Sequence, residues 1–369
     1  MSESRFHFFA SVTPGIERWL HAECLSLVPD AVPIERRGGV ALQGTLAELS
    51  TVVRQSRLAE SVRVRVKHFD ARSFPALNKG LEKVPWHAWI AEGDTPDVKV
   101  VCRKSKLIHS GAVESRAREV IDRCLRRAPS QTIGTVHVRI VNDKVTISVD
   151  ASDELLHRRG WRAETGEASF RETLAAAMLR AADWDGSTPL YDPFCGAGTI
   201  CLEAASIVSG APVRAEEDYA FLRWPTAQRF EFTAPPTASA APASARIFGS
   251  DKSMAAIKQA SANAAAGSFE PWCRFEKRLA GDIWADVPEG ATVVTNLPYG
   301  RRLSPASVEP ALRQLGELIR ARPDLGPVVV MTPRTGLKKA TGLQWEALAT
   351  MQNRGLHVNI LRLDRSKKS

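Results

Sequence analysis

The feature that most constrains the fold is the stretch 190–205, which reads L-Y-D-P-F-C-G-A-G-T-I-C-L-E-A-A. An apolar start, a turn with two glycines and a second apolar run predict a buried strand, a tight loop and a helix that begins at Gly198 or Thr199. A strand that enters a helix through a glycine loop is the repeating unit of α/β sheets. This stretch therefore favours an α/β domain.

Strands and helices alternate along the chain from about residue 168 onward. The pattern predicts helices over 168–182, 198–208, 253–266 and 307–322, and strands over 189–192, 246–250, 291–296 and 327–332. Such alternation is typical of an open, mostly parallel, doubly wound sheet with helices on both faces, the Rossmann-like arrangement.

The front half of the chain has a different pattern. Strands are expected over 6–12, 39–42, 61–69 and 97–103, helices over 16–28, 45–60 and 112–127, and a hairpin over 135–149. This mixture predicts an α+β region. The Pro/Ala/Ser-rich segment 233–245 is expected to be a surface loop.

Composition narrows the range of partners. The 369 residues carry a formal net charge of +9, and residues 1–165 hold 26 Lys+Arg against 20 Asp+Glu. A basic balance favours a polyanionic partner, because each phosphate contact releases counterions.

Composition also bears on location and metal binding. The sequence shows neither a long apolar run nor a secretion signal, so no membrane association and a cytoplasmic location are expected. Its six cysteines form no C-x-x-C pair and are expected to be reduced thiols without a metal site.

The glycine loop has the chemistry of a nucleotide-like cofactor site. Asp192 ends the first strand of the alternating region, where ligands of open α/β sheets bind. Gly196 and Gly198 let the backbone turn sharply and approach a ligand. Thr199 is expected to cap the next helix, whose free N–H groups would face the site.

Two further acids follow later strands. Asp251 ends R-I-F-G-S-D and is suited to accept hydrogen bonds from ribose hydroxyls, whereas Asp282, in A-G-D-I-W, is suited to an adenine amine. For a lone Asp after a strand, helix capping is the competing interpretation. Cys195 has no supporting base or second cysteine in the sequence, so a nucleophilic role is not expected.

A second loop, T-N-L-P-Y-G at 295–300, closes the strand near residue 295. The lone pair of an exocyclic amine is delocalised into its ring, so methylating it needs acceptors that orient the N–H groups. Asn296 offers a side-chain carbonyl and Leu297 a backbone carbonyl, Pro298 restricts φ, and Tyr299 offers a ring for stacking. An Asn-x-Pro turn without chemistry is the competing interpretation.

Basic side chains gather in four places: Arg158, Arg159 and Arg162 around Trp161; Lys99, Arg103, Lys104 and Lys106; Arg301 and Arg302; and Lys338 and Lys339. Each group fits RNA phosphates. The first equally fits an interdomain hinge packed on Trp161, whereas a solvated strand edge is the slightly favoured interpretation of the second.

These motifs together resemble the THUMP-domain guanine-N2 RNA methyltransferases. The resemblance rests on both loops and on L-H-R-R-G-W-R (156–162), E-T-L-A-A-A-M (172–178), K-S-K-L-I-H-S-G-A-V-E (104–114) and F-L-R-W-P (221–225). It implies a ferredoxin-like segment over 1–60, a THUMP RNA-binding domain over 61–153, a linker over 154–167 and a methyltransferase domain over 168–369.

The resemblance also implies the cofactor and the site residues. S-adenosyl-L-methionine would be bound by Asp192, Pro193, Phe194, Cys195, Gly196, Gly198, Thr199, Asp251 and Asp282, and the target pocket would be lined by Asn296, Leu297, Pro298 and Tyr299. The expected reaction is methylation of guanosine N2 in 23S rRNA, with tRNA as the next substrate.

Two alternatives stay open. The family usually has N-P-P-Y, whereas N-L-P-Y is also similar to the rRNA adenine-N6 dimethylases, so adenine-N6 methylation of RNA or DNA is one alternative. The other is an RNA-binding protein with an inactive methyltransferase domain. The sequence does not indicate an oligomeric state.

Overall fold

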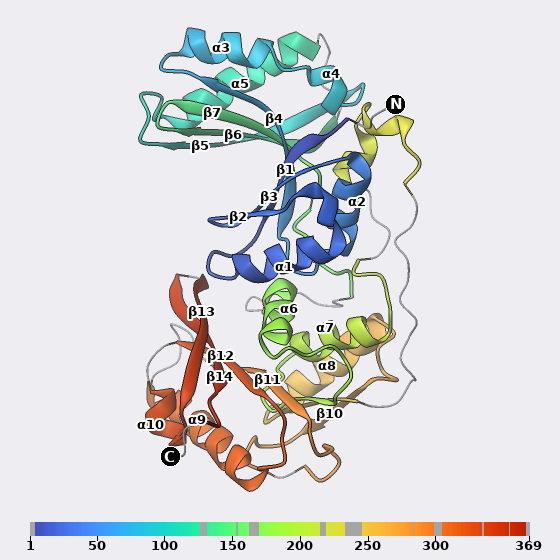
Figure 1. The fold of residues 1–369 in the computed structure, drawn as a ribbon, viewed down its shortest axis with the longest axis vertical. Helices are drawn as coiled ribbons and strands as arrows, with labels where there is room; N and C mark the ends of the chain where they lie inside the picture. Colours follow the sequence, from blue (N-terminus) through green and yellow to red (C-terminus); the bar gives the residue numbers. More distant parts are fainter. Residues whose placement is uncertain are drawn as a thin grey trace. The chain divides into compact units, whose positions relative to one another are not determined.

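The computed structural model describes residues 4–125, 131–152, 154–161, 170–214, 219–232, 246–282, 284–298, 305–333, 336–353 and 355–366. The chain divides into two compact units. The first comprises residues 1–12, 20–156 and 216–235, and the second comprises 13–19, 157–215 and 236–369 (Figure 1). Within the described residues, no helix is both long and apolar enough to cross a membrane.

The first unit is built on a mixed seven-stranded sheet with the order β2-β3-β1-β4-β7-β6-β5. Its strands are β1 (Phe6–Ser11), β2 (Ile34–Arg36), β3 (Gly39–Gly44), β4 (Ser61–Asp70), β5 (Asp94–Arg103), β6 (Gln131–Val141) and β7 (Lys144–Asp150). Its helices are α1 (Glu17–Leu27), which begins in the second unit, α2 (Leu46–Gln55), α3 (Phe74–Glu82), α4 (Trp86–Trp89) and α5 (Ser110–Leu125).

Local sequence explains several of these elements. Helix α2 begins with a capping box, in which Thr45 and Glu48 satisfy each other's backbone N–H groups at 3.2 and 2.7 Å. The β6–β7 turn places Asn142 and Asp143 at φ of 52° and 63°, the conformation that a tight two-residue hairpin requires. The predicted hairpin is thereby confirmed.

A segment distant in sequence completes the first unit. The Phe221 N–H donates to the Ala151 carbonyl at 3.2 Å, and the Trp224 ring meets that of Trp89 edge to face at 5.2 Å. Arg223 binds Asp94 at 2.9 Å. The motif F-L-R-W-P is thus packed in the first unit, although it follows the glycine loop in the chain.

The second unit is a seven-stranded sheet with the order β10-β9-β8-β11-β12-β14-β13. Its strands are β8 (Leu190–Asp192), β9 (Ile247–Asp251), β10 (Cys273–Lys277), β11 (Thr292–Asn296), β12 (Val328–Pro333), β13 (Trp345–Asn353) and β14 (Leu356–Leu363). Its helices are α6 (Glu172–Ala181), α7 (Thr199–Val208), α8 (Met254–Ala266), α9 (Pro305–Ala321) and α10 (Leu337–Thr341). Strands β8 to β12 are parallel, and β14 is antiparallel to both of its neighbours.

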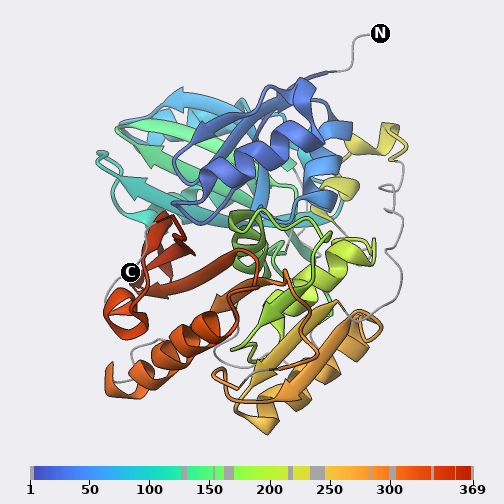
Figure 2. The same cartoon turned by 60° about the horizontal axis from the view of Figure 1, so that its bottom comes forward.

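Helices cover both faces of this sheet, as the alternation predicts. α6, α7 and α8 pack on one another and on the sheet, and α9 packs on β11 and β12 through Leu312, Leu315 and Leu318 (Figure 2). The strand order reverses between β8 and β11, which is the topological switch point where ligands of such sheets bind. The two loops singled out in the sequence follow these two strands.

Candidate functional site

Asp192 lies at the carboxyl end of β8 and is buried, with 1% of its surface exposed. Its Oδ1 atom accepts hydrogen bonds from the Thr295 hydroxyl at 2.5 Å and from the Phe194 N–H at 3.1 Å. Burial, with a smaller contribution from the charge of Asp251, raises the pKa of Asp192 to about 7, although the two hydrogen bonds oppose the rise.

The Thr295 hydrogen bond joins the two loops directly. Thr295 is fully buried near the end of β11 and immediately precedes Asn296. No role was predicted for Thr295 from the sequence, although it is the first residue of the motif T-N-L-P-Y-G. The only signal for this bond in the sequence is that a threonine stands among buried strand residues, one position before the predicted acceptor Asn296.

The glycine loop turns as its sequence predicts. Gly196 has φ of 54°, and a Cβ added there would meet no atom within 4 Å. Gly198 has φ of 83° and occupies the N-cap position of α7. The expected cap at Thr199 is wrong, because helix α7 begins at that residue and Gly198 occupies the N-cap position.

Neighbouring elements hold this loop in place. The Cys195 N–H donates to the Ser250 carbonyl at 2.9 Å, and the Asn263 amide of α8 donates to the Ala197 carbonyl at 3.1 Å. Burial raises the pKa of the Cys195 thiol well above its usual range, and the charges of Asp192 and Asp251 add to the rise. A thiolate nucleophile at Cys195 is therefore disfavoured.

Asp251 is tied to the same loop. Its Oδ2 atom accepts the Gly196 N–H at 3.2 Å, and its Oδ1 atom accepts the Ser253 N–H at 2.9 Å, at the start of α8. A carboxylate oxygen accepts more than one hydrogen bond, so Asp251 keeps capacity for a ligand hydroxyl. Asp282 is exposed in a turn, where it accepts the Leu279 N–H at 3.3 Å.

Asn296 ends β11, the neighbour of β8, and directly follows Thr295, whose hydroxyl binds Asp192. Its Oδ1 atom is buried and has no hydrogen-bond partner among the described residues. A buried carbonyl without a donor costs about 1 to 3 kcal/mol, so this atom needs a donor that the described part of the chain does not supply.

The residue after Asn296 is fixed by packing. Leu297 is fully buried in the core with Val330 and Leu315, and its N–H donates to the Met331 carbonyl at 3.1 Å. Pro298 follows and is partly buried. Tyr299, Arg301 and Arg302 lie outside the described residues, as does the segment 233–245.

The basic cluster around Trp161, predicted to contact phosphates or to form a hinge, begins the main part of the second unit. Arg159 is 3% exposed, and its guanidinium meets both carboxylate oxygens of Glu203 on α7 at 3.3 Å. Trp161 is also buried. The interpretation of Arg159 as a contact for RNA phosphates is therefore wrong. Arg162 lies outside the described residues.

A ligand with hydroxyl and amine donors fits this arrangement. Gly196 leaves open space over the loop, Asp251 retains acceptor capacity, and Asn296 presents an unpaired carbonyl at the adjacent strand end. Pro193 and Phe194 continue the loop from Asp192, with Phe194 packed against the core. The structure thus brings together all the predicted loop residues that it describes; Asp282 stands apart in its own turn.

Comparisons with known proteins agree with this geometry. A family model described as the RMKL-like methyltransferase domain matches residues 159–352, more than half of the chain. The chain is 31% identical to the ribosomal RNA large subunit methyltransferase K/L of Syntrophotalea carbinolica, over 97% of the chain and 53% of that protein. It therefore spans about half the length of this relative.

Two further likenesses cover whole chains. The chain is 29% identical to slr0064, a candidate RNA methyltransferase of Synechocystis, over 97% of the chain and 96% of that protein. The crystal structure of SMU.472, a candidate methyltransferase complexed with SAH, superposes with a TM-score of 0.84 at 22% identity and covers 100% of both chains. This likeness shows the methyltransferase fold.

Proposed function

The chain belongs to the RMKL-like methyltransferase domain family, and from this we propose that it is an S-adenosylmethionine-dependent RNA methyltransferase that acts on the N2 amine of a guanosine, in 23S rRNA first and in tRNA second. The observation that carries the proposal is the buried Oδ1 atom of Asn296, which has no hydrogen-bond partner in the described part of the chain and lies one residue after the Thr295 that binds Asp192. The name of the Syntrophotalea relative supports ribosomal RNA as the substrate. The family name supports methyl transfer.

The residues described above fit the cofactor. Asp251 would accept the ribose hydroxyls, Gly196 and Gly198 would let the backbone approach, and Asp282 would meet the adenine amine. When bound, S-adenosylmethionine supplies an electrophilic methyl group. The main contribution of the chain is to position its partners, with no covalent intermediate.

Asn296 would activate the target amine through hydrogen bonding. Its Oδ1 atom accepts one N–H of the amine, and the Leu297 carbonyl accepts the other, which turns the nitrogen lone pair toward the methyl group. Forming the new N–C bond would break the S–C bond of the methyl donor, which would leave as S-adenosylhomocysteine, and the amine would lose one proton to solvent. The Leu297 backbone is held for this task by its N–H bond to Met331.

The target base would have to leave its stack to reach Asn296, as enzymes that modify bases require. Tyr299 would stack on the displaced base. The front half of the chain, with residues 61–153 as a THUMP domain, would supply RNA affinity.

The proposal is tested by incubating the protein with methyl-labelled cofactor and separated rRNA and tRNA pools, followed by nucleoside analysis. We expect N2-methylguanosine in the rRNA pool. If the analysis finds N6-methyladenosine instead, the target base is adenine and not guanine. RNA binding without any transfer would favour the inactive-domain alternative.

A further inference from the structure

One face of the first unit's sheet carries basic side chains that none of this unit's described helices covers. Residues that pair across neighbouring strands point to the same face. Arg65 of β4 is aligned with Ser148 of β7, and Ser148 is aligned with His137 of β6. Arg139 lies two residues after His137 on β6 and therefore points to the same face as Arg65. On β5, Lys99 is aligned with His137, so Lys99 and Arg103 share that face as well.

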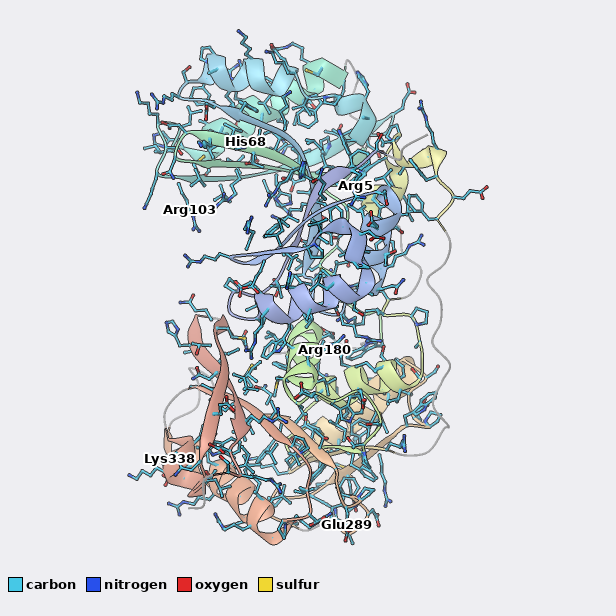
Figure 3. All side chains as sticks on the ribbon, in the orientation of Figure 1. Arg5, His68, Arg103, Arg180, Glu289 and Lys338 are labelled. Atoms are coloured by element: carbon cyan, nitrogen blue, oxygen red, sulfur yellow. The ribbon has the colours of Figure 1, made fainter. Side chains whose placement is uncertain are left out.

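The opposite face of these strands is the core. Val98, Val138 and Ile147 point there and are buried. Helices α3 and α5 pack on that side. Figure 3 shows Arg103 on the side of the sheet away from these two helices. We refer to the exposed residues Arg65, Lys99, Arg103 and Arg139 as the basic sheet face.

The members of the basic sheet face have no carboxylate partner among the described residues. Partial burial lowers the pKa of Arg65, and the charges of Arg139 and Arg36 lower it further. The Arg65 guanidinium lies 5.0 Å from the centre of the Phe9 ring. The cations therefore face one another with their mutual repulsion uncompensated.

The acids on this face do not neutralise it. Asp150 is buried and engaged by Arg63 at 3.5 Å and by His137 at 3.3 Å. Asp97 is engaged by Arg118 of α5 at 3.3 Å. Asp70 stands at the outer end of β4, aligned with Lys144.

The helical face of the same unit provides a contrast. There Arg116 is paired with Glu119 at 2.8 Å, and Arg123 is paired with Glu82 at 2.5 Å. These arginines also contribute to the positive charge of the front half, but each lies within ion-pair distance of a carboxylate.

We propose that the basic sheet face binds the phosphate backbone of the RNA substrate, an inference that rests on the proposed function for the identity of the polyanion. Unpaired cations on a broad strand surface attract polyanions by counterion release. The described side chains of this face offer no free Phe, Tyr or Trp ring, because Phe9 is covered by Arg65, so contacts are made mainly to phosphates. Among the described residues of β4 to β7, Val101 is the only large apolar side chain that is exposed, which disfavours insertion into a lipid surface.

The test compares two double variants with the same change in net charge. Arg65→Gln/Arg139→Gln removes two cations from the basic sheet face, and Arg116→Gln/Arg123→Gln removes two paired arginines from α5. Affinity for a fluorescein-labelled double-stranded RNA is measured by anisotropy over a series of salt concentrations. The pair Lys99→Gln/Arg103→Gln repeats the test on another strand, and unfolding temperatures check that each variant is folded.

We expect the sheet variants to bind about tenfold or more weakly and the slope of log affinity against log salt to fall by about 2, since each phosphate contact contributes about 0.9. The α5 variant should stay within about twofold of the unmodified protein. If the sheet variants and the α5 variant lose RNA affinity equally, the effect is one of net charge alone. If the sheet variants keep their RNA affinity, the RNA binds elsewhere. Either result overturns the proposal. Binding to anionic phosphatidylserine vesicles but not to RNA would overturn it as well.

This assay does not depend on methyl transfer. If the protein binds RNA through this face but transfers no methyl group, the enzymatic proposal fails and the surface proposal stands. If transfer to guanosine is observed and the sheet variants bind and react normally, the surface proposal alone fails.

Discussion

The two sheets of this chain use polar groups in opposite ways. In the second unit, Asp192, Thr295 and Asn296 are placed at strand ends where water is largely excluded, and one acceptor is left unpaired. In the first unit, Arg65 and Arg139 are exposed on an open face. A buried acceptor discriminates because few ligands satisfy its geometry, whereas exposed cations attract any polyanion. On the proposals above, the second unit's sheet would provide the chemistry and the first unit's sheet the affinity.

The strongest test of this division is Asn296→Ala. Removing a preorganised polar group from a transition state costs about 10² to 10³ in rate, so we expect a loss of methyl transfer of that size, measured with labelled cofactor. RNA affinity should stay unchanged within about twofold, because the substitution touches no cation. A variant that transfers methyl groups at the normal rate would remove Asn296 from the mechanism.

A second test addresses charges inside the second unit. Arg159→Met removes the guanidinium that pairs with the buried carboxylate of Glu203, which is expected to lower the free energy of unfolding by about 3 to 5 kcal/mol in denaturant titrations. Arg139→Gln on the basic sheet face should change it by less than about 0.5 kcal/mol. The double variant Arg159→Met/Glu203→Leu should recover much of the loss. Equal stability of the Met single variant and the unmodified protein would contradict the buried pair.

Gly196→Ala separates strain from ligand contact. At φ of 54° an added Cβ costs about 1 to 2 kcal/mol of stability, and it projects into the open space over the loop. We expect affinity for S-adenosylhomocysteine, measured by calorimetry, to fall about tenfold or more, a 1.4 kcal/mol effect. The control is Gly290→Ala, which has φ of 74°, equally open surroundings and the same strain. Similar binding losses in both variants would assign the effect to stability alone.

Thr295→Val should produce the smallest effect, which is a shift in the pH dependence of cofactor affinity. It removes a hydrogen bond to the ionised carboxylate, so the pKa of Asp192 should rise from about 7 by roughly one unit. Cofactor affinity that depends on ionised Asp192 would then reach its plateau at higher pH, and Thr295→Ser should restore the original profile. Identical pH profiles for the Val and Ser variants would show that the bond does not tune Asp192.

The same carboxylate affects stability with a definite sign. Its pKa is raised above the value near 3.8 expected in the unfolded chain, so the folded protein holds the proton more tightly. This contribution to stability is complete below pH 4, declines as the pH rises towards about 7 and is absent above it. Asp192→Asn should flatten that part of the stability profile.

Much of the second unit was predictable from the sequence because its signals are local. The glycine loop, the strand before it and the alternation of helices follow from periodicity and turn residues within short windows. Position at a strand end then brought Asp192, Asp251 and Asn296 to one edge of the sheet, since parallel strands share that edge. The cap at Thr199 failed because Gly198, with its positive φ, already occupies the cap position.

Long-range partnerships were not predictable. The bond between Thr295 and Asp192 joins residues 103 apart, and the Arg159–Glu203 pair joins residues 44 apart. Nothing in the local pattern distinguishes a buried arginine paired with a helix from an exposed one aimed at phosphates. The β13–β14 hairpin was missed for a related reason, because the position of β14 between β12 and β13 depends on pairing and not on periodicity.

The return of residues 219–232 to the first unit has a consequence for how the chain is made. Phe221 and Trp224 are buried there, so the first unit lacks part of its core until these residues have been synthesised. By that stage β8 and α7 of the second unit have already been synthesised. The first unit therefore cannot complete its core before part of the second unit has been synthesised, and a fragment cut near residue 156 should emerge with exposed apolar surface and a tendency to aggregate.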